Sequence, residues 1–366
     1  MSNTQAARTV SGGAVVLDET LCRQKTQLSN RAGLSSGAGT RLATVASTGF
    51  AGGTCSLLAC ALFIFVFLLL GACATPQTDR IRATASALPQ PVELTDVPFF
   101  PQEEYQCGPA ALATVLDAAG AFVTPDELTS EVYLPKRKGS LQLELIGAAR
   151  RQGRIPYVLR PELESVFAEV DSGNPVLVLQ NLSFWWYPEW HYAVVVGFDL
   201  AGDRIVLRSG REKRHVIPIE IFERTWRRSH YWAMVVMPPD RLPFTAEEIP
   251  YLQSVAALER LSRWETVGTA YTTALTRWPK SVVARMGLGN SRYALGDVQG
   301  AEQAFRQATV DHPDAAVAFN NLALMLAEEN RWQEALAAAQ RAVELGGPQM
   351  QTFRETLKQI EAQRPK

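Results

Sequence analysis

Helical and strand-like patterns divide the middle of the chain into two halves. The apolar positions of residues 108–119 fall on one helical stripe, and Gly120 ends the pattern. Further helical patterns follow Thr124 and run through residues 141–151. After Pro175 the pattern changes to short apolar runs, which predict strands at 176–180, 191–199, 204–210, 215–219 and 231–238. Helices followed by an antiparallel sheet predict one α+β domain over residues 92–240.

The carboxyl-terminal residues repeat with a period of 34. Pro279 and Pro313 stand 34 residues apart, and each closes a helical pattern. The same step aligns small or apolar residues in three columns: Val267, Ala301 and Ala335; Tyr271, Phe305 and Ala339; Ala274, Ala308 and Ala342. Small residues are needed where paired helices cross closely, and this spacing resembles the tetratricopeptide repeat. The first helices fit less well, because Ser254-Val255 stands where the family has Leu-Gly or Leu-Ala.

The repeat predicts an all-α domain over residues 248–366, joined to the α+β domain by a linker at 241–247. Three repeats would fill residues 248–349, and a capping helix would cover 350–364. The resemblance implies a concave surface that binds a protein or peptide partner. The alternative is a structural buttress for the preceding domain.

The amino end follows neither pattern. Residues 1–55 show no hydrophobic periodicity and predict disorder, whereas residues 56–72 contain no charge. This apolar run could cross a bilayer as a helix, or form the core of a signal peptide. Leu70-Gly71-Ala72-Cys73 resembles the lipobox of bacterial lipoproteins, which implies removal of residues 1–72 and lipidation of Cys73. Residues 73–91 would then be the lipidated cysteine and a tether.

Localisation and cysteine use follow from that resemblance. An Ala after Cys73 implies a lipid anchor in the outer membrane, with the protein facing the periplasm. Of the cysteines at positions 22, 55, 60, 73 and 107, only Cys107 would remain as a thiol. A solitary thiol in an exported protein favours a reactive role over the alternative, a buried cysteine retained by chance. The formal net charge of −1 gives no electrostatic case for a nucleic-acid partner.

Cys107 has the surroundings that thiol chemistry needs. A thiol at a helix start meets the positive end of the helix dipole and free N–H groups, which lower its pKa. His191, at the start of a predicted strand, could take the thiol proton. The side chain of Gln102 could donate to an oxyanion. The alternatives are a loop-bracing Gln102 and a core histidine.

Two sequence motifs support the same three residues. VPFFPQEEYQCGPAAL resembles the Q-x4-C-G-P-x-A signature of the double-glycine leader peptidases, and WHYAVVVGFD resembles a strand of that papain-like family. The resemblance implies Cys107 as nucleophile, His191 as general base and Gln102 as oxyanion donor. The family usually orients its histidine with an Asp, where this chain has Ser209. A hydroxyl accepts a hydrogen bond but does not stabilise an imidazolium as a carboxylate does.

Three tryptophans stand close to His191 in sequence. Trp185, Trp186 and Trp190 are expected to bind substrate, and an ordinary packed loop is the alternative. The spacing of the remaining histidines is unlike that of zinc ligands, so we expect neither metal nor cofactor. The sequence therefore predicts a lipid-anchored cysteine peptidase that cleaves peptide bonds. A weak or inactive scaffold lipoprotein and a thiol-dependent amidase or acyl transferase are the alternatives.

Overall fold

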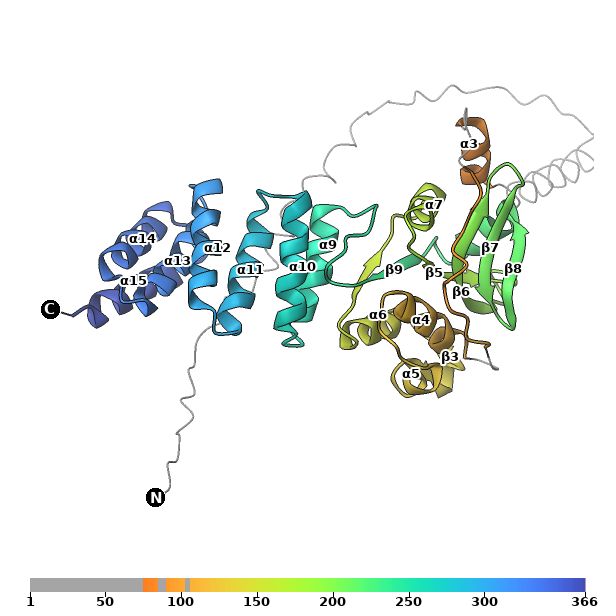
Figure 1. Cartoon of the computed structure of the whole chain (residues 1–366), viewed down its shortest axis with the longest axis horizontal. Coiled ribbons are helices and arrows are strands. Elements are labelled where there is room, and N and C mark those ends of the chain that lie inside the picture. The colour runs from red at the N-terminus through yellow and green to blue at the C-terminus, as the bar shows by residue number, and fades with distance from the viewer. Residues whose placement is uncertain (1–74, 85–89, 103–105, 366) are drawn as a thin grey trace, which may run out of the picture. The chain divides into compact units, whose positions relative to one another are not determined.

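The computed structural model describes residues 75–84, 90–102 and 106–365 (Figure 1). The predicted leader, signal peptide and lipobox with Cys73 lie outside these residues.

An antiparallel sheet forms the centre of the first domain. The sheet has seven strands among the described residues, and the short strand β1 (Val92–Glu93) pairs with one end of the central strand β6. The order of the others is β4 (Ile155–Val158), β9 (Ala233–Met237), β5 (Val176–Asn181), β6 (Trp190–Asp199), β7 (Arg204–Ser209) and β8 (Glu212–Pro218). Strands β5 to β9 correspond to the five predicted runs. Strand β4 was not predicted, because it is short and contains Pro156, which sequence patterns count against a strand.

Helices cover both faces of the sheet. On one face pack α4 (Cys107–Ala118), α5 (Pro125–Val132) and α6 (Gln142–Arg151), together with the β2–β3 hairpin (Tyr133–Leu134 and Gly139–Ser140). The other face carries α7 (Leu163–Asp171) and α8 (Ile219–Arg227), which bury Phe222 and Trp226. Successive side chains of β6 point to opposite faces of the sheet, so Val194 packs in the core on the α4 side and Val195 in the core on the α8 side.

The expected tether after Cys73 is wrong for the described residues 76–84, which form helix α3 (Pro76–Thr84). Buried Glu223 of α8 accepts hydrogen bonds from the backbone N–H groups of Gln77 (3.1 Å) and Thr78 (2.7 Å). Free N–H groups and a positive dipole at a helix start favour such a carboxylate. Ile81 completes the docking by packing into the domain core. Composition alone could not show this partner, because Glu223 lies far along the chain.

The described chain continues into a run of paired helices, as the 34-residue period predicted. They are α9 (Glu248–Glu259), α10 (Trp264–Arg277), α11 (Val282–Ala294), α12 (Val298–Asp311), α13 (Ala316–Glu328), α14 (Trp332–Leu345) and α15 (Met350–Gln363). Close crossing explains the glycines of α11. A Cβ at Gly287 would lie 2.2 Å from the ring of Tyr271, and one at Gly289 would lie 2.4 Å from Phe305.

Helix α9 departs from the repeat pattern for a physical reason. Tyr251 and Val255 of α9 share a core cluster with Ile155 and Tyr157 of β4. The helix therefore packs against the α+β domain, where a preceding repeat would otherwise lie. Ser254-Val255 reflects that different neighbour.

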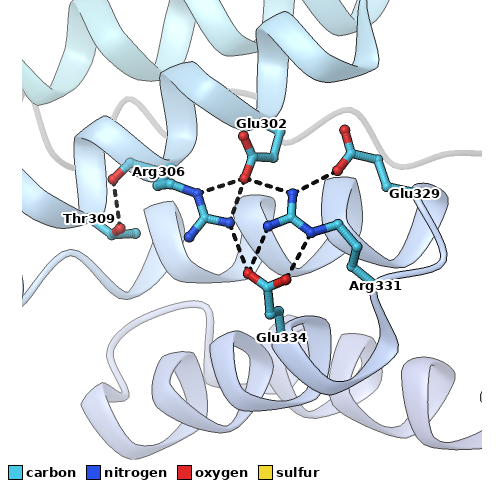
Figure 2. A network of polar contacts seen from close by, with 6 residues as sticks. All are labelled: Glu302, Arg306, Thr309, Glu329, Arg331 and Glu334. Atoms are coloured by element: carbon cyan, nitrogen blue, oxygen red, sulfur yellow. Dashed lines mark hydrogen bonds and ion pairs between the residues drawn. The ribbon is translucent and has the colours of Figure 1, made fainter.

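A network of charged side chains ties two of the later helices together (Figure 2). Glu302 of α12 bonds Arg306 on the same helix and Arg331 just before α14. Glu334 of α14 bonds both arginines from the other side. The network joins neighbouring repeats through polar contacts beside their apolar core.

Candidate active site

Cys107 is the first residue of α4, and the residues after it fit that position. Pro109 lies in the first turn, where its missing N–H removes no helical hydrogen bond. Gly108 is required by close approach, since a Cβ there would lie 2.4 Å from the Ser140 hydroxyl. The Cys-Gly-Pro sequence therefore lets the β2–β3 hairpin pack directly against the helix start.

The sulfur of Cys107 meets two opposing influences. Hydrogen bonds from the backbone N–H groups of Tyr192, Gly108 and Cys107 itself lower the pKa of the thiol. Burial raises it and is the larger effect, so the pKa lies above the ordinary value and the lowered pKa expected from the helix start is wrong. The resting group is therefore a neutral thiol at neutral pH.

His191 is the second residue of β6 and lies beside β7. Its Nε2 is 2.9 Å from the Ser209 hydroxyl oxygen. When Nε2 donates this hydrogen bond, Nδ1 is left as the basic nitrogen. Burial lowers the pKa of His191 from 6.5 to about 4, and the charge of His215 adds a smaller contribution. The imidazole is consequently neutral at pH 7.

Gln102 is brought to the same place. Its backbone N–H donates to the carbonyl of Gly210 (2.9 Å), and its buried side-chain amide lies 3.4 Å from the carbonyl oxygen of Tyr192. Both Gln102 and the sulfur of Cys107 thus contact the backbone of Tyr192, the residue after His191. The structure brings together all four residues predicted for catalysis, with Ser209 as the fourth; their roles stay predictions.

The nearby aspartates serve the opposite end of the strand. Asp199 accepts from the backbone N–H of Gly202 (2.8 Å) and from Arg204, and Asp203 pairs with Arg82. Eight residues along β6 separate Asp199 from His191, a span of about 26 Å. Neither carboxylate can orient the histidine.

Sequence analysis missed a buried arginine that supports this site. Arg208 of β7 is 4% exposed, and its guanidinium donates to the carbonyl oxygens of Leu94, Thr95 and Val97. These bonds hold the segment that leads to Gln102. The missed signal was a charged residue at an inward position of an apolar strand, which calls for buried partners.

The predicted substrate-binding tryptophans lie in or beside the connection between β5 and β6. We call residues 182–190 the aromatic loop. Trp185 is 79% exposed, Trp186 64% and Trp190 52%. The alternative of an ordinary packed loop is wrong for these rings, while their binding of substrate stays a prediction.

The described residues contain neither a metal-ligand cluster nor a membrane-spanning helix. No group of three His, Cys, Asp or Glu side chains among them could hold a metal ion. Within the same ranges, every helix is too short or too polar to span a bilayer.

Two family models match the chain. Residues 94–234 match the peptidase C39-like family, and residues 269–309 and 286–349 match the tetratricopeptide repeat. Among curated proteins, none matches the chain.

Solved structures similar to parts of the chain include the following three. A Bacillus anthracis protein described as a C39-like peptidase is 18% identical and covers 41% of this chain and 98% of its own, with a TM-score of 0.35. The peptidase domain of Streptococcus ComA is 22% identical, covering 39% of this chain and 98% of its own, with a TM-score of 0.33. The Yersinia enterocolitica chaperone SycD is 16% identical, covering 30% and 81%, with a TM-score of 0.29. By its matches to the family models, the chain carries a peptidase C39-like domain followed by tetratricopeptide repeats.

Proposed function

We propose that the chain is a membrane-attached cysteine peptidase that cleaves peptide bonds by acyl transfer through Cys107. The observation that carries the proposal is the shared contact of Cys107 and Gln102 with the backbone beside His191. Nucleophile, oxyanion donor and base are the three parts that acyl transfer needs.

The pKa directions favour general-base catalysis over a preformed ion pair. With a neutral thiol and a neutral imidazole at rest, His191 takes the proton as the sulfur attacks the peptide carbonyl. The Gln102 amide and the Cys107 backbone N–H donate to the oxyanion. The imidazolium then protonates the leaving amine, and the C–N bond breaks to leave a thioester. Water, deprotonated by His191, attacks the thioester and releases the carboxylic acid and the thiol.

Membrane attachment and partner binding complete the proposal. Lipidated Cys73 would hold the protein in the outer membrane with the peptidase domain in the periplasm. The repeats would bind a protein or peptide. A hollow of about 430 Å³ is lined by residues of α10 and α11, and the exposed hydroxyls of Thr269 and Thr272, which donate within α10, can still accept a hydrogen bond from such a ligand.

A peptide-library digestion by the full chain tests the activity. We expect cleavage by the wild type and none by Cys107→Ala or His191→Ala, while the matched cysteine variant Cys60→Ala keeps full activity. Cleavage that survives Cys107→Ala would overturn the mechanism. For the anchor, the Cys73→Ser variant should remain uncleaved, at the size of the precursor, and lose lipid labelling. A variant that is processed to the same size as the wild type and stays on the membrane would contradict lipidation.

A second candidate function is a catalytically weak binding protein. It is favoured by Ser209, because a hydroxyl leaves the imidazolium of His191 without a carboxylate partner. In that case the library digestion shows no cleavage by the wild type, and a substrate peptide still binds to both wild type and Cys107→Ala.

A further inference from the structure

We propose that the aromatic loop, residues 182–190, docks into the interface of a lipid bilayer. The inference rests on the membrane attachment in the proposed function and adds a second contact with the membrane.

The loop exposes an unusual amount of aromatic surface. Besides the three tryptophans, Phe184 is 57% and Tyr187 75% exposed, and Leu182 is also exposed. No charged residue occurs from position 181 to 188. Exposed apolar patches of this kind mark binding surfaces, and Trp and Tyr are the residues that prefer the boundary between headgroups and acyl chains.

The rings are presented by a fixed backbone. Buried Asn181 accepts hydrogen bonds from the N–H groups of Ser183 (3.1 Å) and Glu189 (3.0 Å), and it donates to the carbonyl of Phe184 (3.2 Å). Arg228, which directly follows α8, donates to the Asn181 carbonyl and holds the base of the loop. The loop therefore does not need to bury its rings in order to be ordered.

The rings also support each other outside the domain. Phe184 and Trp186 stack with centroids 4.8 Å apart, and Trp185 meets Trp186 edge to face at 5.6 Å. Such a cluster offers one continuous apolar surface.

The start of the described chain indicates a bilayer as the occupant. Thr75 is 5% exposed and α3 is fixed to the domain by Glu223, so little slack follows the apolar run 56–72. Cys73 stands two residues before Thr75, a reach of about 7 Å at most. A lipidated cysteine and an uncleaved membrane helix would both hold the domain at the bilayer surface.

Hydrogen bonds place the first residues of α3 on the side of the sheet where the aromatic loop begins, while the other end of α3 points to the β6–β7 turn, where Arg82 pairs with Asp203. The N–H of Leu159, after β4, donates to Ala233, and that of Leu179, near the end of β5, donates to Trp232. The ends of β4 and β5 therefore both lie beside the start of β9. Helix α3 begins close to the end of β4, where Gln77 bonds the turn before α7, and the aromatic loop follows the end of β5.

Tryptophan fluorescence tests the proposal without using activity. The full chain carrying Cys107→Ala is reconstituted into phosphatidylethanolamine and phosphatidylglycerol vesicles, with or without dibrominated acyl chains, which quench nearby tryptophans. The loop difference is the emission spectrum of this protein minus that of a version with Trp185→Phe and Trp186→Phe. Trp332→Phe, which removes a half-buried ring on α14, gives the matched control difference.

We expect the loop difference to be blue-shifted and at least halved by brominated lipid, and the control difference to be unchanged. A loop difference that emits as in water and is not quenched would overturn the proposal. A loop difference that ignores brominated lipid but shifts to the blue with a peptide substrate would assign the loop to peptide binding instead. Failure of the chain to float with vesicles would refute membrane attachment and this inference together, and would leave the peptidase proposal intact.

Discussion

Replacing Ser209 by Asp should convert His191 from a weak base into an effective partner for Cys107. The Ser209 hydroxyl lies 2.9 Å from Nε2, so a carboxylate at this position would lie within contact distance of the imidazole. An opposite charge at such a distance favours the protonated ring.

The structure sets the size of the expected effect. Lowering the pKa of His191 from 6.5 to about 4 disfavours the imidazolium by about 3 kcal/mol. A carboxylate partner typically changes a pKa by about 1 to 3 units, which would bring His191 back toward its ordinary value. The thiolate–imidazolium population at pH 6 should rise by at least about tenfold.

Alkylation by iodoacetamide reports that population directly, because the thiolate is the reacting form. The rate is followed by mass spectrometry of the Cys107 peptide from the full chain between pH 5 and 9. In the wild type the rate should climb toward alkaline pH, since burial raises the pKa of the thiol. In Ser209→Asp it should be at least about tenfold faster at pH 6. Ser209→Asn keeps a polar neighbour without charge and should resemble the wild type. Equal rates for the Asp and Asn variants, or a wild-type rate already at its plateau at pH 6, would refute this account.

Three further outcomes concern stability. His191 has a lower pKa in the folded than in the unfolded chain, so the unfolded chain binds the proton first as the pH falls. The free energy of unfolding is therefore at its full value above pH 6.5 and decreases as the pH falls toward 4, by about 2 kcal/mol at pH 5. Urea unfolding at pH 7 and pH 5 should show that loss in the wild type and not in His191→Gln, and equal losses would contradict it. Arg208→Lys should lower the unfolding free energy by about 2 kcal/mol, because a single ammonium cannot reach both the carbonyl of Lys213 and the carbonyls of residues 94–97 that the guanidinium fork spans, whereas exposed Arg211→Lys should change it little. Glu302→Gln should cost about 1 kcal/mol at low salt and less at 0.5 M salt, and a loss independent of salt would exclude an ionic network.

The sequence predicted the parts of the fold that depend on local pattern. The 34-residue period gave the paired helices, and apolar runs gave strands β5 to β9. Helices α7 and α8 were not predicted. Their buried faces include the acids Glu169 and Glu223, which a hydrophobic pattern counts as solvent-facing. Their partners come from distant segments that no local window contains.

The residues of the candidate site could be predicted where short sequence motifs identify them. Cys107 and His191 stand at the starts of a helix and a strand, and the Gln102 spacing followed from the family resemblance. What the sequence could not give was the electrostatic state. Burial decides the pKa directions of Cys107 and His191, and burial depends on how α4 packs against β6.

Two buried carboxylates tie the flanking segments to the C39-like domain. Glu223 accepts from the backbone of Thr78 before the domain, and Glu169 accepts from the N–H groups of Phe244 (3.2 Å) and Thr245 (2.7 Å) after it. Because a buried carboxylate is costly when some of its hydrogen bonds are missing, both flanking segments stabilise the folded domain. Residues 76–84 of the expected tether (73–91) and the expected linker at 241–247 are therefore parts of the fold. A fragment limited to the matched residues 94–234 would leave Glu169 with Asn174 and Glu223 with Tyr231, but would remove the backbone N–H donors of both carboxylates, so the folding unit extends beyond the family match on either side.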